Sequence, residues 1–405
     1  MKPTNIKIEQ PWLDSDGVQS VMRALEAEGG VARFVGGCVR DALFHRPVRD
    51  IDIATDSTPE KVMELLTAAG LRYAPTGLAH GTITAIADGH GFEVTTLRHD
   101  AETDGRRAKV AFTDDWLVDA QRRDFTMNAL YCDADGTLYD PVGGLADIAA
   151  EKVRFIGAAD DRIVEDYLRI LRFFRFHAWY GTGEMDADGL QSCLRRQEGI
   201  GGLSIERIRT EFLRLLECPN PLPTVSVMAQ TGILSAILPE AVDIAALERV
   251  VGTEDAAGVA DPLRRLVCLF EADMSRAVAL ARSWKLSNDD KKRVKSLARA
   301  RAVGSFSDDE AKIALYEGGQ TAFIDSLLVW SSRYDDRVAA LLHLAQTWKR
   351  PTFPLNGQDV MARGVGEGQA IGQILNGLEG QWIAEVFAAD RAELLARLDA
   401  MTTDS

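Results

Sequence analysis

Two aspartates separated by one isoleucine, Asp50 and Asp52, are the residues whose types and spacing indicate chemistry most directly. In a β-strand both would project from one face, with Cα atoms about 6.5–7 Å apart at a rise of about 3.3 Å per residue. Carboxylates at that separation can hold two cations about 3.5–4 Å apart, the arrangement that moves phosphoryl and nucleotidyl groups. Glu93, between apolar neighbours in GFEVT, is a third candidate ligand. The pattern predicts a site for two Mg²⁺ ions and a nucleoside triphosphate.

A double glycine, Gly36-Gly37, stands thirteen residues before Asp50 and is the candidate phosphate seat. Glycines let a ligand approach the backbone closely, and N–H groups at the start of a helix near Cys38 would face phosphates. Arg40 would add a charged clamp. A double glycine alone marks only a turn, and Asp-x-Asp is common on solvated strands. Their combination at this spacing predicts a nucleotide site.

The segment EDYLRILRFFRF has the spacing of one amphipathic helix. On a helical wheel one half is apolar, and the other half is charged and carries Glu165, Asp166, Arg169, Arg172 and Arg175. A solvated face with i,i+3 and i,i+4 ion pairs would explain the same pattern.

Together these motifs resemble the signature of the polymerase-β-type nucleotidyltransferases, and specifically the class II family that contains tRNA CCA-adding enzymes and bacterial poly(A) polymerases. The likeness begins with GGCVRDALFHRPVRDIDIAT. RRDFTMNALY, DPVGGLADI, EDYLRILRFFRF and LSIERIRTEFLRLL follow in the order of that family's head and neck motifs. The resemblance is strong over residues 31–217 and weaker through the C-terminal half.

The resemblance implies that Asp166 and Arg169 act as an amino-acid template for the incoming base, with Arg172 and Arg175 directed toward phosphate or toward that pair. The chemistry is consistent with this role. Cytosine and adenine both present an amino donor beside a ring-nitrogen acceptor, which an Asp and an Arg can match, whereas guanine and uracil present the reverse pattern. A mismatched base would leave buried groups unpaired, at about 1–3 kcal/mol for each group.

In RRDFTMNAL, Asp124 resembles the family residue that contacts the ribose, and Arg123 resembles a triphosphate contact. A capped helix start, with Asp124 or Thr126 as the N-cap, is compatible with these roles.

The elements that must position these residues change in type along the chain. From residue 31 to about residue 140, β-rich pieces interleave with a helix at residues 58–69, where Thr58 can cap and Pro59 opens the helix. The polar stretch 96–112 has no apolar periodicity and is predicted to be a loop, which in the resembling family favours full CCA addition. Helical patterns dominate after DPVGGLADI, and a helix with a capping Ser204 is expected over residues 204–216.

We therefore expect an α+β chain in three parts. A head, residues 1–140, would hold a small mixed sheet of the polymerase-β nucleotidyltransferase type and the catalytic carboxylates. An all-α neck, residues 141–217, would carry the base-recognition helix, and an all-α body and tail, residues 218–405, would bind RNA.

The formal net charge of −15 over 405 residues disfavours a general nucleic-acid coat, so RNA would need a local basic patch. The best patch lies in residues 282–301, capped near Ser287 or Asn288, although a solvated helix face is an equal alternative. Its predicted RNA contacts are Arg282, Lys285, Lys291, Lys292, Arg293 and Lys295. Five scattered cysteines disfavour a disulfide framework or a zinc site. The sequence contains neither an apolar run of about 18 residues nor an N-terminal signal stretch, so we expect a cytoplasmic protein without membrane contact.

The leading hypothesis is a template-independent tRNA nucleotidyltransferase that adds the 3′-terminal CCA from CTP and ATP and releases pyrophosphate. Enzymes that add only CC or only A, and poly(A) polymerases, share the head and neck motifs and stay open as alternatives. A non-catalytic RNA-binding relative is the alternative from another class, and a small-molecule adenylyltransferase fits a long helical C-terminal half less well. The sequence gives no indication of an obligate protein partner.

Overall fold

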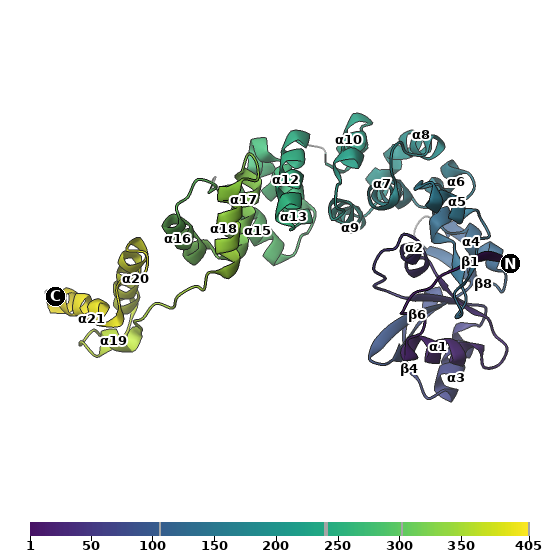
Figure 1. Cartoon of the computed structure of the whole chain (residues 1–405), viewed down its shortest axis with the longest axis horizontal. Coiled ribbons are helices and arrows are strands. Elements are labelled where there is room, and N and C mark those ends of the chain that lie inside the picture. Colours follow the sequence, from purple (N-terminus) through teal and green to yellow (C-terminus); the bar gives the residue numbers. More distant parts are fainter. Residues whose placement is uncertain (105–106, 239–241, 301–302, 404–405) are drawn as a thin grey trace. The chain divides into compact units, whose positions relative to one another are not determined.

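The computed structural model describes residues 1–104, 107–238, 242–300 and 303–403. The chain divides into two compact units, Met1–Pro239 and Glu240–Ser405, and each is described by itself (Figure 1). The division into head, neck, and body with tail stays a prediction.

An eight-stranded mixed sheet forms the centre of the first unit, with strand order β1-β10-β9-β2-β3-β6-β5-β4. β3 and β6 pair in parallel, and the other neighbouring strands that the structure describes pair antiparallel. The predicted α+β class with a small mixed sheet is confirmed. The strands span Pro3–Lys7 (β1), Ala32–Val35 (β2), Asp52–Thr55 (β3), Arg72–Gly77 (β4), Thr82–Ala87 (β5), His90–Thr96 (β6), Tyr131–Cys132 (β9) and Thr137–Tyr139 (β10).

Two helices cover the sheet where β5 lies. α1 (Asp16–Glu26) and α3 (Pro59–Ala68) pack on each other and on β5 (Figure 1). β5 alternates buried Ile83, Ala85 and Ala87 with half-exposed residues, as expected for a strand with one covered face. α3 begins as predicted, because the Thr58 side chain accepts a hydrogen bond from the Lys61 N–H.

Most of the polar stretch 96–112 forms two paired strands instead of the predicted loop. β7 (Arg98–Asp104) and β8 (Arg107–Phe112) pair antiparallel as a separate two-stranded sheet. Backbone groups make the ladder, so it does not require the apolar alternation that the sequence lacks. Residues 105 and 106 lie outside the described part of the chain.

The rest of the first unit is built from helices, of which α7 and α9 lie side by side (Figure 1). α9 begins after Ser204 as predicted, although the Ser204 side chain makes no capping hydrogen bond. The helices span Gly37–Leu43 (α2), Trp116–Gln121 (α4), Gly144–Ala149 (α5), Ala159–Glu165 (α6), Leu168–Tyr180 (α7), Ala187–Arg196 (α8), Ile205–Leu216 (α9), Leu222–Gln230 (α10) and Ile233–Ile237 (α11).

The single helix predicted for EDYLRILRFFRF is broken at Asp166. α6 ends at Glu165, Asp166 takes an extended conformation (φ −155°, ψ 104°), and α7 begins at Leu168. An Asp side chain can replace the helical hydrogen bonds of nearby N–H groups, and the Asp166 carboxylate accepts from the N–H of Leu168 at 3.1 Å. The aspartate therefore stands at a turn, and the three arginines share the helix that follows it.

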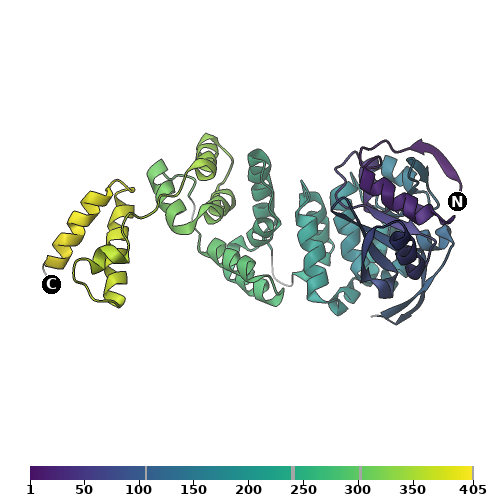
Figure 2. The same ribbon diagram turned by 90° about the horizontal axis from the view of Figure 1, so that it is seen from below.

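The described residues of the second unit form helices and the segments that connect them, and Figure 2 gives a second view of these helices. They span Ile244–Ala257 (α12), Pro262–Cys268 (α13), Met274–Ser283 (α14), Asn288–Arg299 (α15), Asp308–Gly318 (α16), Gln320–Trp330 (α17), Asp336–Thr347 (α18), Gly357–Met361 (α19), Gln369–Ala384 (α20) and Arg391–Thr403 (α21). α20 and α21 pack on each other, and their Leu378, Trp382 and Leu394 share an apolar cluster with Tyr316 of α16. No helix among the described residues is long and apolar enough to cross a membrane.

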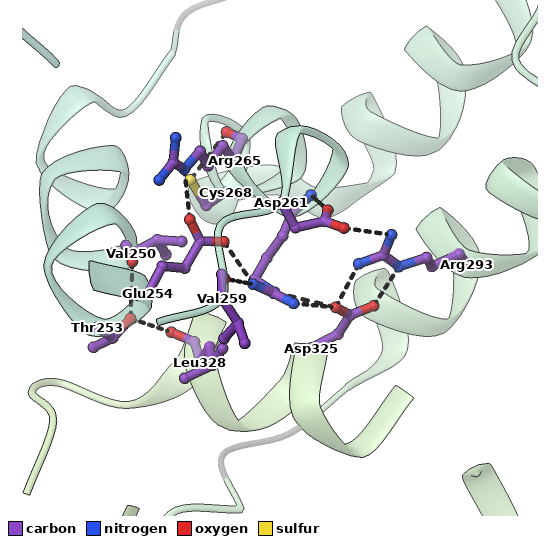
Figure 3. A network of polar contacts seen from close by, with 11 residues as sticks. Val250, Thr253, Glu254, Val259, Asp261, Arg265, Cys268, Arg293, Asp325 and Leu328 are labelled. Carbon is purple, nitrogen blue, oxygen red and sulfur yellow. Dashed lines mark hydrogen bonds and ion pairs between the residues drawn. The ribbon is translucent and has the colours of Figure 1, made fainter. Parts of the chain in front are cut away.

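A buried network of charges joins α12, α13, α15 and α17 (Figure 3). Glu254 is fully buried and binds Arg264 at 2.6 Å and also Arg265. Asp325 is 1% exposed and accepts hydrogen bonds from Arg264 and from Arg293. Because each buried charge has opposite charges as partners, the network fixes how these helices pack.

Candidate active site

Asp52 opens the strand that carries the predicted metal site, whereas Asp50 precedes it. β3 pairs with β2 only as far as Val35↔Asp52, because Gly36 (φ 73°) then turns the chain into α2. The expectation that both aspartates lie in one strand is therefore wrong for Asp50, which has no partner on β2.

Glu93 lies directly beside Asp52. The two residues are Cα partners across the parallel pair β3 and β6. Burial, together with the charges of Glu93 and Asp50, raises the pKa of Asp52 to about 6, although Arg123 and Arg40 oppose the shift. No described hydrogen bond or ion pair holds these three carboxylates. A divalent cation would relieve their repulsion.

A cavity of about 510 Å³ opens beside the double glycine. A methyl group added at Gly36 would lie 3.8 Å from Asp52 Oδ2 and 3.8 Å from Arg123 Nη1, so the Asp52 carboxylate adjoins the cavity wall at the double glycine. Seven arginines line the cavity: Arg40, Arg98, Arg122, Arg123, Arg169, Arg172 and Arg207. The cavity wall also contains four other residues predicted to bind the nucleotide: Gly36, Gly37, Asp124 and Asp166. So many guanidinium groups in an acidic chain suit a polyanion such as a triphosphate.

Arg40 is a fixed charge in this wall. It is only 9% exposed, and its Nη1 donates to Asn128 Oδ1 at 2.7 Å while Nε donates to Asp41 at 2.9 Å. Its guanidinium lies 4.3 Å from the centre of the Tyr180 ring. These contacts leave Arg40 little freedom to turn away from the double glycine.

Asp119, which was not predicted, holds two of the arginines. Its carboxylate, 1% exposed, accepts from Arg122 at 2.8 Å, from Arg123 at 3.0 Å and from the Tyr131 hydroxyl at 2.8 Å. Burial alone would raise the pKa of Asp119, but Arg123 and Arg122 bring it below its usual value. The i,i+3 and i,i+4 spacing of DAQRR was a readable signal for these pairs.

Asp124, the predicted ribose contact, is buried and fully engaged. It accepts from Arg172 Nε at 2.7 Å, from Asn128 Nδ2 at 2.9 Å and from its neighbour's N–H at 2.9 Å. Burial would raise the pKa of Asp124, yet Arg172 and Asn128 lower it, so the group is ionised. Asn128 thus bridges Asp124 and Arg40.

The two predicted base-reading residues lie on the same cavity but have different partners. Arg169 donates to the carbonyl oxygens of Arg162 at 2.8 Å and Arg122 at 3.1 Å, and it forms an ion pair with Glu165. Asp166 Oδ2 accepts from Arg207 Nη2 at 2.7 Å. Arg207 was not predicted, although it lies in the quoted segment LSIERIRTEFLRLL.

Arg175 does not line the cavity. Its Nε donates to the buried Glu211 at 2.6 Å, and its guanidinium lies over the Phe176 ring at 4.3 Å. Burial lowers the pKa of Arg175 even though Glu211 opposes the shift. Arg175 therefore joins α7 to α9 and takes no part in the cavity wall.

The basic patch of the second unit extends from the end of α14, through Lys285 in the connection, into α15. Ser287 caps α15 as predicted, by accepting from the Asp290 N–H at 3.0 Å. Lys292 and Lys295 border a groove of about 970 Å³ together with Arg299. Arg282, Lys285 and Lys291 lie outside this groove lining.

Arg293 differs from the other cations of the patch. Its guanidinium binds Asp325 at 2.6 and 2.7 Å and Asp261 at 2.9 Å, inside the buried network (Figure 3). Arg293 joins α15 to α17, because the buried carboxylate of Asp325 needs a charged partner. We therefore withdraw Arg293 from the predicted RNA contacts.

Comparison with known proteins bears on this geometry. Residues 32–154 match the family described as "Poly A polymerase head domain", and residues 195–244 match "Probable RNA and SrmB- binding site of polymerase A". The chain is 34% identical to the mouse "CCA tRNA nucleotidyltransferase 1, mitochondrial", over 96% of this chain and 92% of that protein. The chain belongs to the class II family of CCA-adding tRNA nucleotidyltransferases.

Other members of this CCA-adding family are similar over most of their length. The CCA-adding enzyme of Latilactobacillus sakei is 31% identical, over 89% of this chain and 91% of that enzyme. The crystal structure of the Bacillus stearothermophilus CCA-adding enzyme in complex with CTP superposes with a TM-score of 0.78 at 25% identity, and covers 98% of this chain and 99% of that one. The resemblance from the sequence motifs is thereby confirmed, and the cytoplasmic location stays a prediction.

Proposed function

We propose that the protein adds the 3′-terminal CCA to tRNA, taking CTP and ATP in turn and releasing pyrophosphate. The observation that carries this proposal is the arginine-lined cavity in which the double glycine and Asp166 meet beside Asp52. Membership of the CCA-adding family supports it, as does the similarity to an enzyme crystallised with CTP.

Asp50, Asp52 and Glu93 are the residues that would hold Mg²⁺, two ions being expected. Among the described residues no three His, Cys, Asp or Glu side chains already stand close enough to enclose a metal. Mg²⁺ suits such an open site, because it commonly takes one or two carboxylates and completes its shell with water and substrate phosphates. When bound, it would supply activation of the 3′-hydroxyl and neutralisation of the phosphates.

Other residues of the chain would bind the triphosphate, the ribose and the base. Arg40 and Arg123, each fixed by internal partners, would hold the triphosphate next to the double glycine. Asp124, fixed by Arg172, would meet the ribose. Asp166 and Arg169 would accept cytosine and adenine, because on the Watson–Crick edge these two bases, unlike guanine and uracil, pair an exocyclic amino donor with a ring-nitrogen acceptor.

For tRNA, we propose that Lys292, Lys295 and Arg299 bind backbone phosphates, with Arg282, Lys285 and Lys291 as further contacts. Lys292 is 79% exposed, and its Nζ lies a loose 3.6 Å from the carboxylate of Asp289. Cations that keep most of their surface in water can exchange their counterions for phosphates.

The direct test incubates the whole protein with Mg²⁺ and three tRNAs that end before CCA, after C and after CC, with CTP and ATP supplied separately and together. We expect C, C and A to be added in order and synthesis to stop. Addition of C without A, or unlimited A on any RNA, would support the partial enzymes or a poly(A) polymerase instead. Asp52→Ala should abolish all addition, and an active Asp52→Ala variant would refute the metal assignment.

A further inference from the structure

We propose that Arg207 is a positioning residue for base selection, which acts by fixing the orientation of the Asp166 carboxylate. The inference rests on the proposed function, in which Asp166 reads the incoming base. Arg207 lies in α9 and contacts Asp166 in the turn between α6 and α7.

Asp166 needs such a partner because helical geometry does not hold it. It lies in the extended break between α6 and α7, and its side chain is 34% exposed. Its two oxygens have separate partners, the Leu168 N–H on Oδ1 at 3.1 Å and Arg207 Nη2 on Oδ2 at 2.7 Å. A carboxylate bound at both oxygens cannot rotate to follow a donor in another place. It therefore demands an amino group at one position of the base.

Arg169 does not provide this restraint. Its guanidinium points to Glu165 and to the carbonyl oxygens of Arg162 and Arg122. Among the described residues, the cation that forms an ion pair with Asp166 is Arg207. The two arginines would have different roles. Arg169, held by its internal partners, would contact the base from the cavity wall, and Arg207 would orient the aspartate.

α9 can hold Arg207 at this place because a second residue of α9, one turn after Arg207, contacts α7. Glu211 lies four residues after Arg207, binds Arg175 at 2.6 Å and lies 3.8 Å from Arg172. Glu211 is 5% exposed and sets the packing of the helices, whereas the Arg207 side chain is 46% exposed. Removal of Arg207 should thus leave the helices in place.

The test compares Arg207→Ala with the wild type in the full chain, using a tRNA that ends before CCA. The readout is the ratio of kcat/KM for CTP over UTP. We expect this ratio to fall about tenfold, the effect of one charge-assisted hydrogen bond, while the melting temperature changes little. Arg207→Lys should recover part of the ratio, because it keeps the charge without the planar fork. Arg214→Ala is the matched control, an exposed arginine of the same helix outside the cavity lining.

A double-mutant cycle decides whether Arg207 acts through Asp166. In an Asp166→Ala background, Arg207→Ala should lower the ratio no further. An additive effect, or a wild-type ratio in Arg207→Ala, would overturn the inference while the proposed function stands. A wild-type protein that incorporates neither C nor A would contradict the proposed function itself, and the inference with it.

Discussion

Asp52 carries its charge in a place that disfavours the charge. It is half-buried beside Glu93, and burial is the main reason that its pKa rises to about 6. Asp119 and Asp124 are also buried, but arginines bring their pKa values down. The difference is that arginines hold Asp119 and Asp124 in ion pairs, whereas no described ion pair holds Asp52. A functional site of this kind reduces stability until its ligand binds.

The residue-scale prediction is that Asp52→Asn stabilises the metal-free protein at pH 7, by about 1–2 kcal/mol, while it abolishes nucleotide transfer. The folded state holds the Asp52 proton more tightly than the unfolded state. The wild type therefore loses stability as the pH rises from the ordinary 3.8 to about 6, and the cost is complete above that range. Thermal unfolding in a chelator, from pH 4 to pH 7, measures the difference between variant and wild type.

Asn at this position removes the titrating proton, so the advantage of Asp52→Asn should grow through that window. Asp114→Asn, an exposed change, serves as the control and should give no trend. An Asp52→Asn variant that is less stable than the wild type at pH 7 would contradict the claim that the charge of this carboxylate destabilises the folded protein.

At the scale of elements, the turn that presents Asp166 depends on a close approach of two segments. Tyr167 follows Asp166, and its ring packs on Gly199 in the short 3₁₀ segment Gln197–Gly202. A Cβ atom at Gly199 would lie 2.0 Å from the ring's Cδ1 and 2.4 Å from its Cγ, so the ring would have to move. The glycine therefore helps to place the base-reading aspartate.

We predict that Gly199→Ala lowers the free energy of unfolding by about 1–3 kcal/mol and reduces discrimination against UTP, because displaced Tyr167 carries Asp166 with it. Gly201→Ala in the same segment is the matched control, since nothing lies within 4 Å of its added Cβ. Urea unfolding and the CTP-over-UTP ratio measure the two effects. Equal behaviour of the two alanine variants would show that the packing of Tyr167 is unimportant.

Sequence reasoning found those site features that depend on local pattern or on the order of motifs. The double glycine, Asp52 and Glu93 come together because strand alternation and pairing are regular. Asp119 also had a local signal in the sequence, its i,i+4 spacing to Arg123.

What the sequence could not predict depends on contacts between distant segments. Arg207 and Asp166 are 41 residues apart and meet only because α9 packs on α7. The place of Asp50 outside β3 follows from where β2 ends, and the buried role of Arg293 follows from Asp325 on another helix. A helical wheel assumes one continuous helix and cannot register that Asp166 breaks it.

At the scale of the whole molecule, an acidic chain must bind a polyanion through local surfaces. The net charge is −15, yet seven arginines line the cavity of the first unit, and Lys292, Lys295 and Arg299 border the groove of the second beside one carboxylate, that of Glu317. Repulsion elsewhere on the surface would limit non-specific RNA binding, so affinity should rest on few phosphate contacts.

We predict that Lys295→Ala with Arg299→Ala weakens tRNA binding and reduces the slope of log K against log salt by about 0.7–0.9 for each phosphate that the variant no longer binds. CTP binding should be unchanged, because these residues belong to the second unit. Lys312→Ala, whose lysine pairs with Asp309 outside the groove lining, is the control. Titration of labelled tRNA at several salt concentrations measures the slope, and an unchanged slope would remove this groove from the RNA-binding surface.

We propose that one cavity in the first unit accepts both CTP and ATP and rejects the other two nucleotides by the pattern of the base edge. Calorimetric titration of the full chain with each nucleotide in Mg²⁺, followed by competition between CTP and ATP, tests it most directly. We predict one site per chain, mutual displacement of CTP and ATP, and binding of UTP and GTP that is at least about tenfold weaker. Simultaneous binding of CTP and ATP, or UTP binding as tight as CTP binding, would contradict the account.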